Sequence, residues 1–139
     1  MKYLKKIKEG EVITYYPEDA TSLTDFEIEP TVGYILEVEK EVTFQVRKGS
    51  RIDEARYKIR KNQYSTIGIP FDKKMRYSDL KPIINQEFMI IYYSYKNARF
   101  ESYHTEFIMD GTEADRLIDP HEGIILLPLE NDLDITLKR

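Results

Sequence analysis

The sequence predicts a mainly β fold: one domain over residues 1–139, a sandwich or barrel of about seven or eight strands with at most one short helix. Apolar and polar residues alternate over several short segments, as in half-buried strands. Turns that contain glycine, proline or aspartate separate these segments. The 139 residues are 41% apolar and 33% charged, which suits one core beneath an ionic surface.

The longest alternating segment spans residues 34–46. Its apolar side chains share one parity and most of its charged side chains share the other, which predicts a half-buried strand. Lys40 interrupts the apolar parity, and the segment is long for a single strand. We therefore expect a bulge or bend at residues 39–41.

A second alternating segment spans residues 55–60 and predicts a strand with one apolar and one cationic face. The apolar set is Ala55, Tyr57 and Ile59, and the cationic set is Arg56, Lys58 and Arg60. We expect the cationic set to form a basic ridge that contacts a partner.

The next elements are shorter. Ile67, Ile69 and Phe71 alternate as in a short strand. Residues 77–82 predict a capped turn or a single helical turn, since Asp79 follows a serine and Pro82 closes the segment.

Residues 87–95 are apolar on both parities, as expected for a strand that is covered on both faces or lies at an interface. We expect this strand at the centre of the sheet. Tyr92, Tyr93 and Tyr95 are candidate interface residues because tyrosine combines a large contact area with a polar tip. Packing of these tyrosines in the core is the alternative.

The C-terminal third predicts three more strands. Residues 96–97 could close a hairpin between the strand at 87–95 and an alternating segment at 99–109. An apolar run at 124–129 and an alternating segment at 133–137 follow.

The formal net charge of −4 is unevenly distributed. Residues 1–46 carry 5 Lys and Arg against 10 Asp and Glu, residues 47–76 carry 10 against 3, and residues 77–139 carry 6 against 12. The basic middle segment could meet an acidic surface of another copy, or the phosphates of a nucleic acid. Tyr57 and Tyr64 lie near these cations, but Tyr57 has the parity of the core face.

No motif indicates catalysis. The chain has two histidines and no cysteine, and it lacks a glycine-rich phosphate loop, a nucleophile elbow and a dinucleotide fingerprint. His104 with Glu106, and His121 among acidic residues, offer metal ligands in no specific spacing. We expect a protein that is not an enzyme and has no cofactor or metal.

We also expect a soluble protein without a membrane partner. No apolar run approaches the roughly 20 residues that cross a bilayer. The N-terminal residues 1–8 lack the apolar core of a signal peptide.

Two stretches resemble LysM-like modules, including those in tail and baseplate proteins of bacteriophages. The first is Tyr57-Lys-Ile-Arg-Lys-Asn-Gln-Tyr-Ser-Thr-Ile-Gly-Ile-Pro-Phe71, followed by Asp79, Leu80 and Asn85, and the second is Ile118-Asp-Pro-His-Glu-Gly-Ile-Ile-Leu-Leu-Pro128. The resemblance implies a strand and two helices in the first stretch and a closing strand in the second. It implies a structural part of a phage tail or a glycan-binding module, and no catalytic residue.

These observations favour a non-enzymatic assembly protein: a small β-domain that docks against copies of itself or other proteins, as in a phage tail or virion ring. The alternative is a ligand-binding module for a glycan or a single-stranded nucleic acid, with aromatic rings that stack on the ligand.

Overall fold

A computed structural model describes residues 3–15, 28–41, 52–119 and 122–139. Strands hold 47% of these residues and helical turns 10%, so the predicted mainly β class is confirmed. Within the described ranges, eleven strands form four sheets, and eight of these strands have four or more residues. None of the sheets formed by the described residues closes into a barrel.

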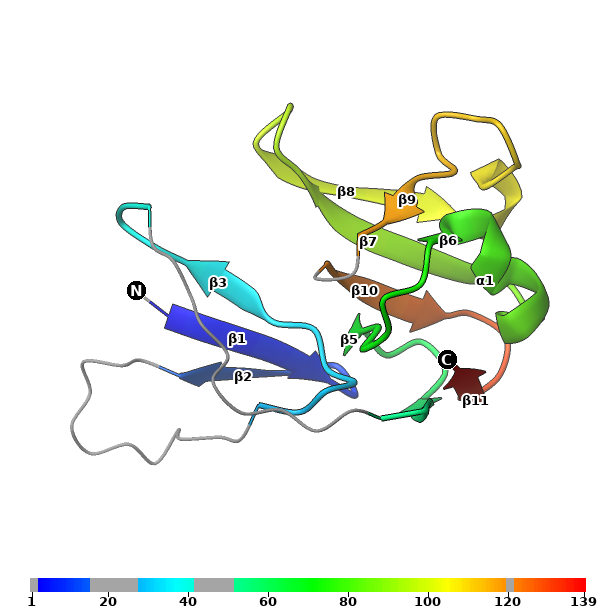
Figure 1. The fold of residues 1–139 in the computed structure, drawn as a ribbon, viewed down its shortest axis with the longest axis horizontal. Helices are drawn as coiled ribbons and strands as arrows, with labels where there is room; N and C mark the ends of the chain where they lie inside the picture. Colours follow the sequence, from blue (N-terminus) through cyan, green and yellow to red (C-terminus); the bar gives the residue numbers. More distant parts are fainter. Residues whose placement is uncertain (1–2, 16–27, 42–51, 120–121) are drawn as a thin grey trace.

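Three strands form the N-terminal sheet, in the order β2-β1-β3. They are β1 (Tyr3–Lys8), β2 (Glu11–Tyr15) and β3 (Ile35–Glu37), and β1 pairs antiparallel with both neighbours. The turn between β1 and β2 has positive φ at Glu9 and Gly10, 51° and 79°. Such a turn matches the twist of a hairpin. This sheet lies at the left of Figure 1.

The second sheet has four antiparallel strands in the order β5-β10-β7-β8. They are β5 (Ser65–Gly68), β10 (Gly123–Pro128), β7 (Phe88–Ser94) and β8 (Arg99–His104). β7 lies between β10 and β8, so the prediction of an interior strand at 87–95 is confirmed. Residues 95–98 form the predicted hairpin turn.

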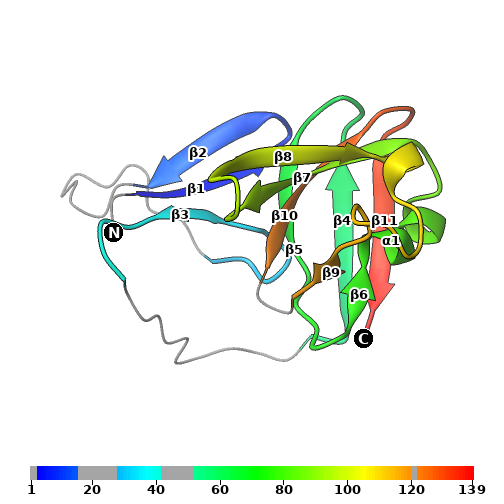
Figure 2. The ribbon, with the colours of Figure 1, turned by 90° about the horizontal axis from the view of Figure 1, so that it is seen from above.

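Two strand pairs and a helix complete the fold. β4 (Glu54–Ile59) pairs with β11 (Leu133–Lys138), and β6 (Met75–Arg76) pairs with β9 (Leu117–Ile118). The helix α1 (Tyr77–Ile84) follows β6 directly. In Figure 2, β4 and β11 run across the direction of β7 and β8.

Helix α1 is longer than the single turn that the sequence predicts. Asp79 Oδ2 accepts a hydrogen bond of 2.7 Å from the backbone N–H of Arg76, which satisfies one of the free donors at the helix start. Asn85 has the left-handed conformation that ends many helices, and its N–H bonds to the Lys81 carbonyl.

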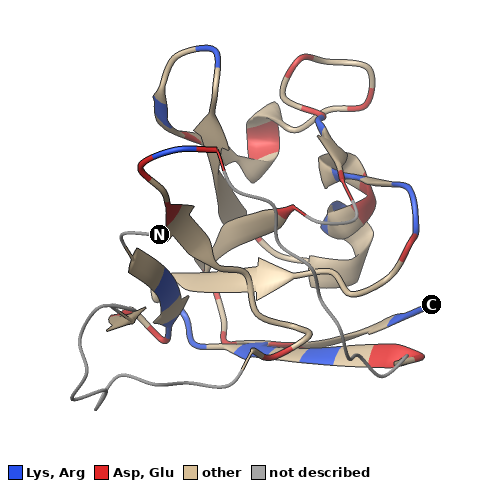
Figure 3. Ribbon diagram, turned by 60° about the vertical axis from the view of Figure 1, so that its left-hand side comes forward, with Lys and Arg blue, Asp and Glu red and all other residues tan. Residues whose placement is uncertain are grey.

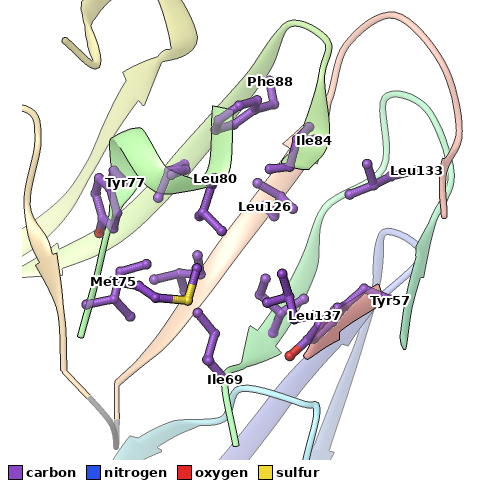
Figure 4. Close-up of a cluster of buried hydrophobic side chains, with 14 of the residues drawn as sticks. Tyr57, Ile69, Met75, Tyr77, Leu80, Ile84, Phe88, Leu126, Leu133 and Leu137 are labelled. Atoms are coloured by element: carbon purple, nitrogen blue, oxygen red, sulfur yellow. The ribbon is translucent and has the colours of Figure 1, made fainter. Parts of the chain in front are cut away.

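The hydrophobic core lies between the four-stranded sheet, α1 and the β4–β11 pair (Figure 4). Its members all come from residues 55–137, and none of the described residues of the N-terminal sheet belongs to it. We call the described part of residues 52–139 the body. The largest fully buried side chains of the body are Tyr77, Phe71, Phe88, Leu80, Ile90, Ile108, Ile124, Leu126 and Pro128.

Three glycines join the N-terminal sheet to the body. The Gly68 N–H donates to the Thr31 carbonyl oxygen at 3.0 Å. A Cβ on Gly33 would lie 2.6 Å from the Ile67 carbonyl oxygen, and a Cβ on Gly123 would lie 3.0 Å from the Gly33 Cα. The atoms that such a Cβ would meet belong to the backbone of other segments and cannot move away as a flexible side chain could. Only glycine, which has no Cβ, therefore lets the chain cross β5 and β10 at this distance.

The structure corrects the strand predicted at 34–46. β3 covers Ile35–Glu37, and the chain bends at residues 39–40, as expected. Leu36, predicted to be buried, is exposed because the core lies in the body and β3 does not contact it. Residues 42–46 lie outside the described residues.

Two other predicted strands end early. β8 stops at His104 and a 3-10 turn (Thr105–Phe107) follows, because the Thr105 hydroxyl bonds to both the N–H and the carbonyl of Phe88, each at 2.6 Å. Met109 is therefore exposed instead of buried. The strand predicted over 67–71 is β5, which ends at Gly68.

Candidate functional site

The tyrosine-rich strand β7 presents two different faces. Cross-strand pairing sets Tyr92 opposite Glu101 and Tyr93 opposite Phe100. Because side chains alternate along a strand, Tyr92 points to the core and Tyr93 to the other face. Tyr92 is only 6% exposed, so it packs in the core and offers no surface to a partner.

Polar groups surround Tyr92 on its buried side. Its hydroxyl donates to Glu101 Oε2 at 2.8 Å, and its ring stacks on Tyr103 with 5.5 Å between centroids. The Arg116 guanidinium lies 4.0 Å from the centroid of the Tyr92 ring, a cation–π distance. Burial raises the pKa of Tyr92. This side of the hairpin is a structural cluster.

Tyr93, Tyr95 and Phe100 form an exposed cluster on the opposite face, which we call the aromatic hairpin surface. Their exposed fractions are 40%, 89% and 49%. The Tyr93 ring meets Tyr95 and Phe100 edge to face, with centroid distances of 5.2 and 5.3 Å. The cluster lies at the β7–β8 hairpin, and β8 is an edge strand of its sheet (Figure 1).

Sequence reasoning missed Phe100. The register of the hairpin could have indicated it, because a turn at residues 95–98 pairs Tyr93 with Phe100 on the same face. The structure thus separates the three candidate tyrosines: Tyr92 in the core, and Tyr93 and Tyr95 on the surface beside Phe100.

The predicted basic ridge lies on β4. Arg56 and Lys58 are exposed on β4 and Arg60 is exposed directly after it, while the intervening side chains are buried, so the predicted alternation is confirmed. Figure 3 shows basic positions alternating with other residues along this strand. Arg56 donates two hydrogen bonds to Asp134, of 2.8 and 2.7 Å, and this pairing lowers the pKa of the Asp134 carboxyl. The face therefore combines cations with a carboxylate from β11.

Of the two tyrosines near these cations, the structure buries one and exposes the other. Tyr57 is buried, and its hydroxyl donates to the Gly68 carbonyl at 2.8 Å. Burial raises the pKa of Tyr57. Tyr64 is exposed. Arg47, Lys48 and Arg51 lie outside the described residues.

A groove separates β1 from β4, with β5 between them. Its volume is about 270 Å³, and Glu29, Thr31 and Val32 contribute to its lining. Four cations line it, two from β1 and two from β4: Lys6, Lys8, Arg56 and Lys58. The sequence gives no local signal for this groove, because the two strands lie far apart in the chain.

His104 is engaged by neighbouring groups. Its Nε2 lies 3.1 Å from Glu87 Oε2, and its Nδ1 accepts a hydrogen bond from the Glu106 N–H. Within the described ranges, no three His, Cys, Asp or Glu side chains come together in a way that could hold a metal ion. His121 lies outside the described residues.

No protein-family model matches the chain, and comparisons with curated proteins and with solved structures found no match. The resemblance to LysM-like modules stays a prediction. β5 lies where that resemblance implies a first helix, and α1 and β10 lie where it implies a second helix and a closing strand. No helix in the described part of the chain is long and apolar enough to cross a membrane.

Proposed function

We propose that this protein is a non-enzymatic assembly component that docks onto other copies of itself through the aromatic hairpin surface. The observation that carries the proposal is the exposed cluster of Tyr93, Tyr95 and Phe100 on the edge of a sheet. Aromatic side chains are enriched at protein interfaces and contribute most of the affinity where they cluster.

Geometry supports docking at this position. The Tyr93 ring packs against both of the other rings, so a partner would meet a partly ordered surface and less side-chain freedom would be lost. Edge strand β8 adjoins the rings, and edge strands can add a strand from another chain through backbone hydrogen bonds. Rings and edge together form one continuous contact region.

The kind of assembly follows from the resemblance alone. The LysM-like stretches favour a tail or ring of a bacteriophage virion as the larger structure. In such a ring, a heterologous contact would repeat between neighbouring copies.

Light scattering coupled to size exclusion tests self-association over a concentration series. We expect a defined oligomer, and we expect the double variant Tyr93→Ala/Phe100→Ala to weaken its association by roughly tenfold or more. Phe107→Ala/Met109→Ala is the matched control, because it removes two exposed apolar side chains elsewhere. A wild-type protein that stays monomeric, or equal weakening by both double variants, would contradict the proposal.

A second candidate function is binding of a glycan or a single-stranded nucleic acid on the same rings. The 89% exposure of Tyr95 favours it, since an accessible ring can stack on a sugar or a base. Titration with oligothymidine at two salt concentrations tests for nucleic-acid binding, whose affinity should weaken steeply as the salt concentration rises. Glycan binding that Tyr95→Ala abolishes in a monomeric protein would favour this candidate over assembly.

A further inference from the structure

The groove between β1 and β4 shares no residue with the aromatic hairpin surface. Apolar and cationic residues both line it. The apolar lining, which we call the apolar trough, includes Ile59 and Ile67, which are buried side chains of β4 and β5, and Val32. We call the four cationic lining residues, Lys6 and Lys8 of β1 with Arg56 and Lys58 of β4, the rim cations.

Two of the four rim cations already have a carboxylate partner. Lys6 Nζ lies 2.8 Å from Glu29 Oε2, and Arg56 binds Asp134. The hydrogen bond from Lys6 and the charges of Lys6 and Lys8 lower the pKa of Glu29.

The other two rim cations, Lys8 of β1 and Lys58 of β4, are exposed. Neither forms an ion pair with another residue in the described ranges. Two exposed positive charges from different strands thus line the same groove as the apolar trough, which suits a ligand with carboxylates flanking an apolar group.

The volume of the groove lies near the lower end of the range for small-molecule pockets. Pockets that enclose a whole small ligand usually measure about 300–1,000 Å³. At about 270 Å³ and open to solvent, the groove is better matched to one or two side chains of a longer chain that passes through it.

The chain itself provides an example of this chemistry. Glu29 ends the sequence Asp25-Phe-Glu-Ile-Glu29, in which acidic and apolar residues alternate. Its carboxylate lines the groove and binds Lys6, while the Ile28 beside it is exposed. A carboxylate of an acidic, apolar segment is therefore already bound in the groove.

We propose that the groove binds an acidic peptide segment of a partner protein, with carboxylates alternating with apolar side chains. Its carboxylates meet Lys8 and Lys58, and an apolar side chain between them enters the trough. A nucleic acid is disfavoured because the chain carries a net charge of −4 and Tyr57, the one aromatic residue among the described residues that line the groove, is buried.

Fluorescence anisotropy with a labelled Glu-Leu-Glu-Leu-Glu peptide tests the proposal. We expect saturable binding that the double variant Lys8→Glu/Lys58→Glu weakens by about tenfold, since two attractive contacts become repulsive. Lys8→Gln/Lys58→Gln should weaken binding less, because it removes the attraction without adding repulsion. Circular dichroism melts establish that each variant is folded.

The matched control is Lys73→Glu/Lys74→Glu, which makes the same charge change at two exposed residues outside the groove. We expect it to change binding by less than about twofold. Equal weakening by the control pair would overturn the proposal in favour of general charge attraction.

Two more probes test the peptide chemistry. A Glu-Ser-Glu-Ser-Glu peptide should bind at least several-fold more weakly, and equal affinity would overturn the role of the apolar trough. Tighter binding of oligothymidine than of the acidic peptide, lost in the Lys8→Glu/Lys58→Glu variant, would reassign the groove to phosphates. Tyr93→Ala/Phe100→Ala should leave peptide binding unchanged, so this site is tested separately from the assembly surface.

Discussion

The body and the N-terminal sheet are held together by different forces. The body encloses a continuous apolar core in which side chains such as Phe88 and Leu126 are fully buried. Lys6 is the only side chain of the N-terminal sheet, among the described residues, that is buried, and it is charged. Apolar burial therefore stabilises the body, whereas polar contacts attach the sheet.

Hydroxyl groups of β5 supply much of that attachment. Thr66 Oγ1 accepts from the Ile7 N–H at 3.0 Å and donates to the Ile7 carbonyl at 3.2 Å. Ser65 Oγ accepts from the Glu9 N–H at 3.1 Å. Hydrogen bonds between these side-chain hydroxyls and the backbone thus link β5 to the β1 hairpin where paired strands would use backbone-to-backbone hydrogen bonds. Because such bonds each contribute about 1 kcal/mol, we expect the sheet to detach at a lower free energy than the body unfolds.

Phe88→Ala should break the body and have the largest effect. It removes a fully buried ring between the sheet and α1, which typically costs about 3–5 kcal/mol of unfolding free energy. Urea unfolding followed by circular dichroism measures the loss. Phe107→Ala, at an exposed aromatic residue, should change stability by less than about 0.5 kcal/mol. A comparable loss in the two variants would show that the core does not stabilise the body as described.

Gly33→Ala should separate the two regions. The new Cβ would lie 2.6 Å from the Ile67 carbonyl oxygen, so the chain crossing must shift, at a cost of about 1–3 kcal/mol. Hydrogen exchange measured by mass spectrometry should show lost protection in residues 3–15 with the body still protected. Gly111→Ala is the control, because its Cβ meets nothing within 4 Å although its φ is positive. Equal loss of protection throughout the chain would contradict separate opening.

The same contrast explains which strands the sequence predicts. In the body, β4 alternates buried and exposed side chains because one face covers the core, so its period is visible in the sequence. β1 carries Lys5, Lys6 and Lys8 on both parities, since polar contacts hold it, and no apolar period marks it. The hairpin with β2 had one local signal, Gly10 in the turn.

The candidate site was only partly predictable for a related reason. The run of tyrosines at 92–95 shows from the sequence alone that β7 is rich in contact groups. Which tyrosine is exposed depends on the segments that pack on each face of the strand, and these cannot be read from the sequence. Tyr92 packs on Tyr103 of the paired strand β8 and on Arg116, which comes later in the chain, just before β9. The groove joins Lys8 to Lys58 across most of the N-terminal half of the chain, so only the folded arrangement brings these charges together.

Thr66→Val should weaken the attachment of the sheet more selectively than the glycine variant does. Valine has a similar shape but loses both hydrogen bonds to Ile7, which we expect to cost about 1–2 kcal/mol. Native-state hydrogen exchange should show faster opening of β1 with little change in α1. Thr112→Val, on an exposed turn, is the matched control. Unchanged exchange in β1 would mean that the hydroxyl does not hold the sheet.

The ion pair of Lys6 and Glu29 should give the smallest effect, and it should depend on pH. The hydrogen bond and charge of Lys6 lower the pKa of Glu29 in the folded protein, while Glu29 remains 41% exposed, so the pair contributes less than about 1 kcal/mol. Because the folded pKa is the lower one, the stabilisation is complete above about pH 4.3, the usual pKa of an unfolded glutamate. It is lost as the pH falls through the folded pKa.

Amide exchange of residues 3–15, corrected for its intrinsic pH dependence, follows this loss. Glu29→Gln should lower the protection of the N-terminal sheet at neutral pH and remove the step at acidic pH, since its side chain does not titrate. Glu113→Gln, at an exposed residue of the body, should keep the wild-type profile. An acidic step that persists in Glu29→Gln would assign the pH dependence to another carboxylate and leave the attachment of the sheet to the hydroxyls of β5 and the glycine crossing.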